Sequence, residues 1–318
     1  MKKINLGVVG VGSMGRNHCR ILQMMKDIDF SGVYDINRES CVDIGKKKNV
    51  KCFSSYRELL MNVDAVIIAV PTKYHYALTK QAIEQGRHVL VEKPFVTTME
   101  EAEMLISLME EKKVIVQVGH IERFNPAVEQ LLGVVDNGKI ISIDARRLGA
   151  PGRSIDVDVI LDLMIHDIDI ILRIANSPPQ HILAMGVSQG NEESVDFASV
   201  LLSFEQGILA NLTASRITQE KIRTLDITES ERFIRTNYLT RELYIYRQTD
   251  SLITPSHSYR QENLVEKILV PYVEPLFAEV DHFIQAIRDN QYPESGVYDA
   301  AKALEVALKI KEKLYLLK

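Results

Sequence analysis

The sequence predicts an α/β domain with a doubly wound parallel sheet, followed by an α+β domain with a mainly antiparallel sheet. Up to residue 118, short runs rich in Val and Ile alternate with longer amphipathic stretches, which is typical of parallel strands covered by helices on both faces. After about residue 120, apolar and polar residues alternate in stretches joined by short turns, which indicates antiparallel strands. A chain of 318 residues is long enough for two domains, which we expect at residues 1–120 and 121–318.

The period of the apolar residues places each element. The parallel strands are expected at residues 4–10, 30–34, 65–70, 88–91 and 114–118. A strongly apolar helix over 161–175 is followed by strands at 181–187, 198–204, 208–215, 224–228, 233–236 and 243–246. Residues 251–261 are polar, contain a proline and are expected to form a loop. Two helices, 275–289 and 297–317, close the chain, and we expect the last one to pack back on the first domain.

Composition and charge exclude several classes of protein. The hydrophobic fraction of 46% and the charged fraction of 25% are those of a folded globular chain. A net charge of -5 argues against a nucleic-acid partner, because phosphate contacts need a basic face. Glycines interrupt the apolar N-terminal run before an export signal or membrane segment is complete, so we expect a cytoplasmic protein without a membrane partner. Cys19, Cys41 and Cys52 lack metal-ligand spacing and are expected to be free thiols.

The turn after the first strand contains a G-x-G-x-x-G motif. Its residues are Gly10, Val11, Gly12, Ser13, Met14 and Gly15. Gly10 permits the tight turn, Gly12 lets the backbone approach a pyrophosphate, and Gly15 lets the helix pack closely on the strand. Ser13 and Met14 open the helix, whose N-terminus attracts an anion. Because the motif follows a strand and opens a helix, it predicts a dinucleotide-binding Rossmann domain rather than a glycine-rich turn without a ligand.

Asp35 indicates which dinucleotide is bound. It ends the second strand about 20 residues after Gly15, where a carboxylate binds the ribose hydroxyls of the adenosine. The same carboxylate repels a 2′-phosphate, so NAD is favoured over NADP. Arg38 is a further expected cofactor contact, and it leaves NADP possible as the cofactor. The alternative for Arg38 is an exposed position at the start of a helix.

Two further loops follow strands of the parallel sheet, at the edge where loops line the ligand crevice. Pro71, Thr72 and His75 follow one strand and are expected to contact the cofactor, although an exposed helix start is the alternative for His75. Glu92 and Lys93 follow the next strand, and a proline fixes the backbone after them. The Lys93 ammonium is expected beside the nicotinamide, where it can polarise a reacting oxygen; a solvated charge is the alternative.

The helix at 161–175 carries one polar stripe. At ~100° per residue, its side chains at positions 162, 166, 169 and 173 fall within roughly a 60° arc. Asp162 and His166 are four residues apart and can touch, and a carboxylate beside an imidazole raises its pKa and orients it. This pair is a candidate general base. A structural Asp–His pair is one alternative, and a metal site is a weaker one because no third ligand is apparent.

These motifs, in this order and spacing, resemble those of the Gfo/Idh/MocA oxidoreductases over essentially the whole chain. The likeness rests on the glycine turn, Asp35, Glu92-Lys93-Pro94, Gly119-His120, Arg123-Phe124-Asn125-Pro126, and Asp162 with His166. It implies a nucleotide-binding domain followed by a large open antiparallel sheet, with NAD or NADP as cofactor. It also implies that Lys93, Asp162 and His166 are catalytic.

Within this family, residues 118–128, 145–153 and 163–169 are most similar to enzymes that oxidise the C3 hydroxyl of UDP-N-acetylglucosamine to a ketone. The resemblance implies cofactor contacts from Arg123 and Asn125, and an aminotransferase as the next enzyme of the pathway. The implied substrate contacts are Lys93, His120, Arg147, Arg153, Asp162 and His166. Which of Lys93 and His166 accepts the proton stays open.

Alternatives to a sugar-nucleotide substrate remain at this stage. The same catalytic residues suit a free polyol or sugar of the inositol type, and the reaction can also run as reduction of a ketosugar. A non-catalytic dinucleotide sensor is less consistent with the presence of Lys93 and His166. One face of the antiparallel sheet is expected to lack helices, so something apolar has to bury it. The alternating apolar residues at 198–202 and 208–212 therefore predict a partner subunit, in a homodimer or homotetramer.

Overall fold

The computed structural model describes residues 3–150, 157–189, 194–248, 252–253, 259–260 and 263–317. The chain divides into two units. The first comprises Met1–Ile121 and Glu274–Leu304, and the second comprises Glu122–Val273 and Glu305–Lys318. Each unit is therefore assembled from two separate stretches of sequence.

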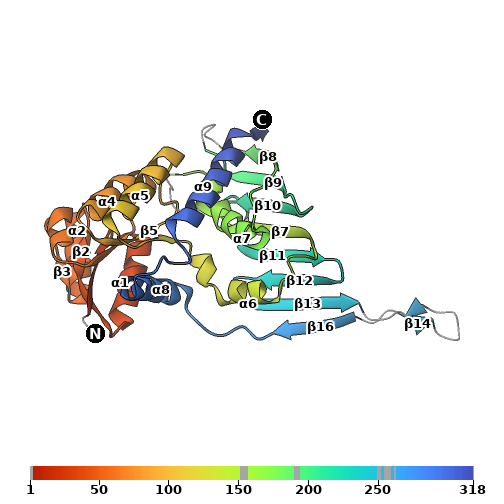
Figure 1. The fold of residues 1–318 in the computed structure, drawn as a ribbon, viewed down its shortest axis with the longest axis horizontal. Helices are drawn as coiled ribbons and strands as arrows, with labels where there is room; N and C mark the ends of the chain where they lie inside the picture. The colour runs from red at the N-terminus through yellow and green to blue at the C-terminus, as the bar shows by residue number, and fades with distance from the viewer. Residues whose placement is uncertain are drawn as a thin grey trace. The chain divides into compact units, whose positions relative to one another are not determined.

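The first unit contains a parallel sheet with the strand order β3-β2-β1-β4-β5-β6 (Figure 1). Its strands are β1 Ile4–Val9, β2 Ile28–Tyr34, β3 Lys51–Cys52, β4 Ala65–Ile68, β5 His88–Glu92 and β6 Val116–Gly119. The strand order reverses between β1 and β4, which pair in parallel at the centre. This is the predicted doubly wound sheet, with β3 as an additional short strand. Ligands of such sheets bind outside the carboxyl ends of the strands at the reversal point.

Helices cover both faces of this sheet, and several of them begin at a side-chain cap. They include α1 Ser13–Met24, α2 Arg38–Lys48, α3 Tyr56–Met61, α4 His75–Glu84 and α5 Met99–Lys112, with a short 3-10 helix, η1 Thr72–Tyr74, before α4. The side chains of Asn37, Ser55 and Thr98 accept hydrogen bonds from N–H groups in the first turns of α2, α3 and α5. None of the described helices has the length and apolarity that crossing a membrane requires.

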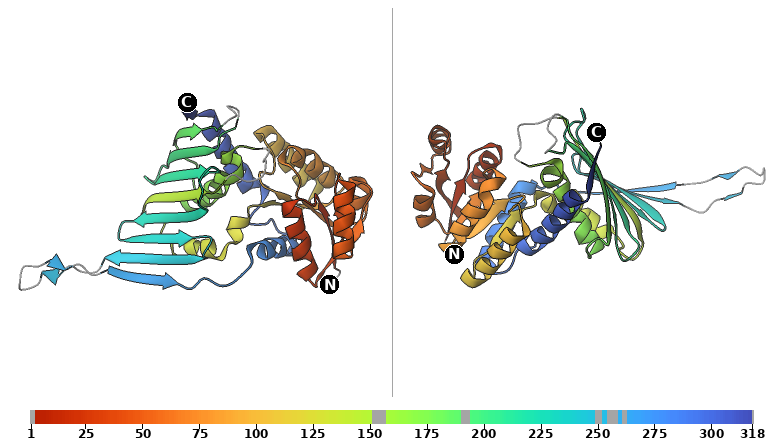
Figure 2. Two further views of the ribbon diagram at one scale, coloured as in Figure 1. Left: turned by 180° about the vertical axis from the view of Figure 1, so that it is seen from behind. Right: turned by 90° about the horizontal axis from the view of Figure 1, so that it is seen from above.

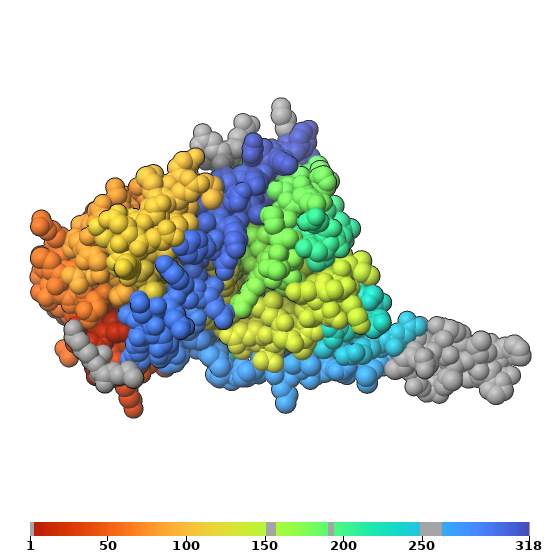
Figure 3. Space-filling view, viewed as in Figure 1, coloured from red at the N-terminus to blue at the C-terminus, as the bar shows by residue number. Residues whose placement is uncertain are grey.

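The helix α8, Pro275–Asp289, belongs to the first unit although most of the second unit precedes it in the sequence. Its side chains Val280 and Phe283 are fully buried in the same hydrophobic core as Leu6 of β1 and Leu22 of α1. In the space-filling view, blue atoms of α8 lie against red atoms near the N-terminus (Figure 3). The predicted helix at 275–289 is confirmed, and it closes the core of a sheet that begins at residue 4.

The second unit contains a nine-stranded sheet with the order β16-β13-β12-β11-β7-β10-β9-β8-β17 (Figure 1). Its strands are β7 Ile140–Leu148, β8 His181–Val187, β9 Phe197–Ser203, β10 Leu209–Ser215, β11 Ile222–Glu229, β12 Arg232–Asn237, β13 Glu242–Gln248, β16 Asn263–Ile268 and β17 Leu314–Leu317. Neighbouring strands are antiparallel except for β7 with β10 and β8 with β17. The predicted mainly antiparallel sheet is confirmed.

Helices of the second unit lie on one face of this sheet, and its other face, termed the outer face below, carries no described helix (Figure 2). They are η2 Ile121–Phe124, which begins one residue before this unit, α6 Pro126–Val134 and α7 Ile165–Ala175. The alternating residues predicted to meet a partner subunit face inward instead: Val200 and Leu202 of β9 and Leu212 of β10 are buried. The residues between them, including Leu201 and Leu209, are exposed on the outer face.

Three predicted elements differ from the structure. The helix expected over 161–175 begins as a π-helix, η3 Ile160–Met164, and continues as α7. The helix expected over 297–317 ends earlier, as α9 Val297–Glu312, because the run Leu-Tyr-Leu-Leu that follows pairs as β17 with the edge of β8. In the expected loop 251–261, residues Leu252–Ile253 and Tyr259–Arg260 pair as strands β14 and β15; its other residues lie outside the described part.

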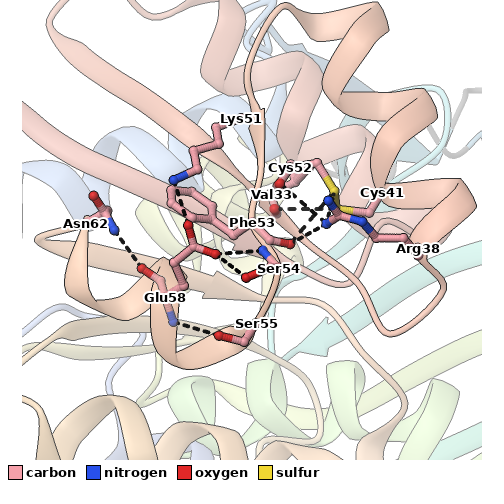
Figure 4. A network of polar contacts seen from close by, with 10 residues as sticks. All are labelled: Val33, Arg38, Cys41, Lys51, Cys52, Phe53, Ser54, Ser55, Glu58 and Asn62. Carbon is pink, nitrogen blue, oxygen red and sulfur yellow. Dashed lines mark hydrogen bonds and ion pairs between the residues drawn. A yellow bond between two sulfur atoms is a disulfide. The ribbon is translucent and has the colours of Figure 1, made fainter.

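The expectation of three free thiols is wrong for two of them. Cys41 of α2 and Cys52 of β3 form a disulfide with a Cα–Cα separation of 5.7 Å (Figure 4), which lies in the usual range for such bonds. Counting cysteines and their spacings does not reveal this pair, because the packing of α2 on β3 brings them together. Cys19 is a free, buried thiol, and its burial raises its pKa to about 12.

Thiol labelling distinguishes the two assignments. In protein prepared without reductant, we expect no cysteine to react with iodoacetamide under native conditions, because Cys19 is buried and has a raised pKa. In denaturant, one thiol per chain should react before reduction and three after it, as counted by intact mass spectrometry. Three reactive thiols in denaturant before reduction would contradict the disulfide.

Candidate active site

The glycine turn between β1 and α1 has the geometry of a ligand cradle. Gly10 has a φ of +86°, and a Cβ on it would lie 2.4 Å from the carbonyl oxygen of Ala69. A Cβ on Gly15 would lie 1.8 Å from the carbonyl oxygen of Gly10. Gly12 has no described atom within 4 Å of such a Cβ. The first and third glycines are therefore imposed by backbone packing, whereas the second leaves open space above the turn.

The helix α1 presents its N-terminus at this turn. Gly12 is its N-cap and provides no side-chain hydrogen bond, and the first turn contains no acidic residue. The N–H groups of Ser13 and Met14 at such a helix start have no partner within the helix. A positive helix end with unpaired N–H groups suits a phosphate, so the turn fits the pyrophosphate of a dinucleotide.

Asp35 stands at the carboxyl end of β2 and binds the glycine turn. Its Oδ2 accepts a hydrogen bond from the N–H of Val11 at 2.7 Å, and its Oδ1 accepts one from the N–H of Asn37 at 2.7 Å. Each carboxylate oxygen can accept a second hydrogen bond. The geometry therefore combines a structural role with free lone pairs at the position expected for the adenosine ribose.

Arg38 is the exposed first residue of α2, and its guanidinium is engaged. Its Nη1 donates to the carbonyl oxygen of Phe53 at 2.7 Å and lies 3.0 Å from the Sγ of Cys52 (Figure 4). The disulfide between Cys41 and Cys52 links α2 to β3 beside this guanidinium. Arg38, the residue that leaves NADP possible as the cofactor, is thus hydrogen-bonded to the loop after β3.

His75 connects two loops at the carboxyl edge of the parallel sheet. It is 1% exposed, so the alternative of an exposed helix start is wrong. Its Nδ1 lies 2.8 Å from the carbonyl oxygen of Pro94, and its Nε2 lies 2.8 Å from that of Val70. Thr72, in η1, is also buried, and Pro71 caps η1. His75 therefore holds the loop after β4 against the loop that contains Lys93.

Glu92 ends β5 and binds a buried histidine. Its Oε1 lies 2.8 Å from the Nε2 of His18 on α1, whose side chain is fully buried. A Cβ on Gly119, its partner on β6, would lie 3.0 Å from the Glu92 Oε2, so glycine leaves room for this carboxylate. Burial raises the pKa of Glu92, but the hydrogen bond and charge of His18 and the charge of Lys93 outweigh it and lower the pKa.

Two residues of the Glu92 environment were not predicted. His18 is a polar residue among the buried residues Cys19, Ile21 and Leu22 of α1. A polar residue on the buried face of a predicted helix is a signal that the sequence pattern alone could have given. Gly119 was noted only as part of a motif. Lys93 follows Glu92 through a partly exposed turn with a cis peptide bond to Pro94, and His120, after β6, is 2% exposed.

The predicted catalytic pair lies at the start of the helical segment η3–α7 in the second unit. Asp162 is half-buried in the π-helix η3, and its N–H donates to the carbonyl oxygen of Asp158 at 2.9 Å. His166 is in the first turn of α7 and is 8% exposed. π-Helical turns inside helices are rare and frequently occur at functional sites.

The rest of the polar stripe is used differently. Asp169 forms a bidentate ion pair with Arg123, with N–O distances of 2.7 and 2.6 Å, and both side chains are buried. Arg173 is exposed near the end of α7. The four positions of the predicted stripe thus separate into Asp162 with His166, a buried ion pair, and an exposed residue.

Arg147 and Asn125 belong to a second buried network beside α7. The Arg147 guanidinium donates to Asp167 at 2.7 and 2.8 Å and to Glu122 at 2.7 Å. Asn125 caps α6 and donates to Glu122 at 3.0 Å. Burial raises the pKa of Asp167 and Arg147 only partly opposes it, whereas Arg147 outweighs burial at Glu122 and lowers the pKa there. Glu122 was not predicted as part of the site.

Some predicted contacts are not tested by the described structure. Arg153 lies outside the described residues. Lys93 belongs to the first unit and Asp162 and His166 belong to the second, so a single catalytic set that contains all three stays a prediction. Among the described residues, no group of three or more His, Cys, Asp or Glu side chains is placed to hold a metal ion.

The chain matches two family models. Residues 4–120 match the oxidoreductase family with an NAD-binding Rossmann fold, and residues 142–234 match the GFO/IDH/MocA C-terminal domain. It is 34% identical to UDP-N-acetylglucosamine 3-dehydrogenase from Acidithiobacillus ferrooxidans, over 90% of both chains. It is 24% identical to myo-inositol 2-dehydrogenase from Thermotoga maritima, over 98% of this chain and 96% of that one.

Solved structures show the same fold. The structure of UDP-N-acetylglucosamine 3-dehydrogenase GnnA from Acidithiobacillus ferrooxidans is similar with a TM-score of 0.89 and 31% identity, over 99% of this chain and 98% of that one. The 3-ketoreductase KijD10 from Actinomadura kijaniata, in complex with TDP-benzene and NADP, is similar with a TM-score of 0.87 and 18% identity, over 99% of both chains. At that identity, the likeness to KijD10 shows the fold alone.

Proposed function

Because the chain belongs to the Gfo/Idh/MocA family of oxidoreductases, we propose that it is an NAD-dependent dehydrogenase that oxidises a hydroxyl of a sugar nucleotide. The proposed substrate is UDP-N-acetylglucosamine and the proposed product is its 3-keto derivative. The observation that carries this choice is the 34% identity, over 90% of both chains, to a protein of that activity. The proposed place is the cytoplasm, and an aminotransferase is the proposed next enzyme.

In the proposed mechanism, His166 accepts the proton of the sugar hydroxyl while Asp162 orients its ring. Lys93 stabilises the developing alkoxide. Bound NAD supplies the acceptor for the hydride that leaves the same carbon. Lys93 and His166 can exchange roles, because either side chain can take up a proton.

The proposed cofactor contacts follow the cradle described above. The glycine turn holds the pyrophosphate, and Asp35 binds the ribose hydroxyls. The loops of Pro71, Thr72, His75 and Glu92, with Arg123 and Asn125, complete the cofactor site. For the substrate we propose Lys93, His120, Arg147, Arg153, Asp162 and His166. Among the described residues, acidic partners accept from three of the five guanidinium N–H groups of Arg147, and we propose that the other two contact the substrate.

A substrate panel tests the proposal. The protein is incubated with NAD and with UDP-N-acetylglucosamine, free N-acetylglucosamine or myo-inositol, and the absorbance of the reduced cofactor is followed. Reduction with UDP-N-acetylglucosamine alone supports a sugar-nucleotide dehydrogenase. Reduction with inositol alone would favour the polyol alternative, and NAD binding without any turnover would favour a dinucleotide sensor.

We expect NAD to bind at least about tenfold more tightly than NADP, because the Asp35 carboxylate opposes a 2′-phosphate. Replacing Asp35 with serine should reduce this preference, chiefly by weakening the binding of NAD. Quenching of intrinsic tyrosine fluorescence or calorimetric titration gives both dissociation constants. Asp43→Ser, at a half-buried position of α2, is the matched control, and an unchanged preference in Asp35→Ser would contradict the assignment.

We further propose that the chain forms a homodimer through the outer face, with a homotetramer as the larger alternative. The exposed apolar side chains there are Leu183, Met185, Leu201, Leu209 and Tyr315. They are contiguous, because Leu183 lies opposite Leu201 in the ladder and Met185 lies opposite Tyr315. Monomeric proteins rarely expose large contiguous apolar patches.

A charge in this patch is expected to separate the subunits. Leu201→Glu should place a carboxylate opposite the same face of the partner, where its desolvation is unfavourable. Light scattering coupled to size exclusion should then give the mass of a monomer, whereas the unchanged chain gives an oligomer. Met61→Glu makes the same change at an exposed methionine of α3 and should leave the mass unchanged. A monomeric unchanged chain would refute the proposal.

A further inference from the structure

A cluster of buried and half-buried polar side chains lies between the parallel sheet and the helices α1 and α8. We term it the Glu92 cluster, and its members are His18, Glu92, Gln117, Glu279 and His282. Besides the contact between His18 and Glu92, the Gln117 amide donates to the carbonyl oxygen of Glu279 at 2.9 Å, and its oxygen lies 3.0 Å from the Nδ1 of His282. These contacts join β5 to α1 and β6 to α8.

Glu279 is the buried acidic residue of α8. Its side chain is fully buried on α8, between turns that contribute Leu276, Val280 and Phe283 to the core. Among the described residues, neither carboxyl oxygen has a hydrogen-bond partner. An ionised carboxylate in such a place is strongly unfavourable, so the group takes up a proton. Burial first, and then the charge of Glu92, raise the pKa of Glu279 well above its ordinary value.

Glu92 has the opposite environment. It accepts the hydrogen bond of His18 from α1, and the charges that act on it come from His18, Lys93 and His75, each of which lowers its pKa. His282, on the same helix as Glu279, is bonded to Gln117, and burial lowers its pKa. The two carboxyl groups of one cluster therefore favour opposite protonation states, which is the arrangement that separates acid and base roles at functional sites.

We propose that Glu279 is a neutral, proton-holding acid that confines the negative charge of the Glu92 cluster to Glu92, next to Lys93. Glu279 acts through Glu92 and is a positioning residue. With Glu279 neutral, Glu92 keeps both its bond to His18 and its negative charge beside Lys93. The link to catalysis rests on the proposed role of Lys93, whereas the protonation states of the cluster do not.

Infrared difference spectroscopy tests the protonation state without any substrate. At neutral pH, Glu279→Gln should lose one C=O stretching band of a protonated carboxylic acid, which shifts in D2O. The control Glu100→Gln removes an exposed glutamate and should keep the band. Identical spectra of Glu279→Gln and the unchanged protein in this region would overturn the proposal. If Glu279→Gln fails to fold, carboxyl-carbon NMR of the unchanged protein should still show one glutamic acid that is protonated at neutral pH.

The dependence of folding on pH gives a second readout. The folded pKa of Glu279 lies above its unfolded value of about 4.3, so between these two values the folded state binds one proton more than the unfolded state. The contribution of Glu279 to stability is therefore fully present below the unfolded pKa and is lost as the pH rises toward the folded pKa. Relative to Glu279→Gln, the folding constant of the unchanged protein should fall by up to about tenfold per pH unit in this window. Parallel curves for the two proteins would overturn the proposal.

The pH profile of turnover connects the cluster to Lys93. Ionisation of Glu279 at high pH would place a second negative charge near Glu92, so Glu279→Gln, which stays neutral and has a similar shape, should extend the alkaline limb of the kcat profile to higher pH. Glu92→Gln should instead lower kcat at every pH. If no sugar nucleotide is turned over, the proposed function fails while the infrared and unfolding results still decide the state of Glu279.

Discussion

Lys93→Met is expected to lower kcat by about 10²–10³-fold or more, because it removes the cation that we propose stabilises the developing alkoxide. Methionine has a similar length and no charge, so the fold and the glycine turn should be unaffected. The dissociation constant of NAD should therefore change little. The measurement combines turnover with UDP-N-acetylglucosamine and calorimetric titration of NAD.

The control for Lys93→Met is Lys80→Met, which removes an exposed lysine of α4 and should leave kcat unchanged. Retention of most of the turnover in Lys93→Met would refute a catalytic role. An equal loss of turnover and of NAD affinity would instead place Lys93 in cofactor binding. His166→Asn separates the two candidate bases, because the side chain that accepts the proton should dominate the acidic limb of the pH profile.

Arg147→Leu is expected to lower the free energy of unfolding by about 3–5 kcal/mol, because it leaves buried charge without a partner. The Arg147 guanidinium is 3% exposed and pairs with both Asp167 and Glu122. Burial already raises the pKa of Asp167, so without Arg147 this carboxyl should take up a proton more readily. Urea unfolding followed by circular dichroism gives the free energy.

A surface ion pair provides the comparison. Arg235→Leu breaks a pair with Asp226 that is more than half exposed on the arginine side, and such pairs contribute at most about 1 kcal/mol. The double variant Arg147→Leu with Asp167→Leu should recover part of the loss, because it removes one of the unpaired charges. A cost of Arg147→Leu no larger than that of Arg235→Leu would contradict the buried network.

The backbone geometry of the glycine turn could be predicted because most of its requirements are local. A positive φ at Gly10 and the contact of Gly15 with the Gly10 carbonyl arise within a few residues of one strand–turn–helix segment. The predicted polar stripe was less complete, because periodicity shows that side chains share a face and not which partners they meet. Asp169 pairs with Arg123, which is 46 residues away in the sequence.

Other parts of the candidate site depend on segments that are far apart in the sequence. The Glu92 cluster includes α8, which follows Glu92 by more than 180 residues. The disulfide depends on how α2 packs on β3, and the strand β17 forms because the edge of β8 is open to it. The local sequence pattern is equally consistent with a helix that continues to residue 317. Only the pairing with β8 decides that residues 314–317 form a strand instead.

The sequence by itself determined the order of strands and helices, the glycine turn with Asp35, and the presence of polar residues on a buried helix. These features follow from hydrophobic period and turn chemistry, which act between near neighbours. The tertiary structure decided which buried charges are paired and that the Glu279 carboxyl group meets no hydrogen-bond partner in the part of the chain that the structure describes. Partner choice is decided by packing between distant segments, where the low polarity of the interior makes each buried charge depend on what lies beside it.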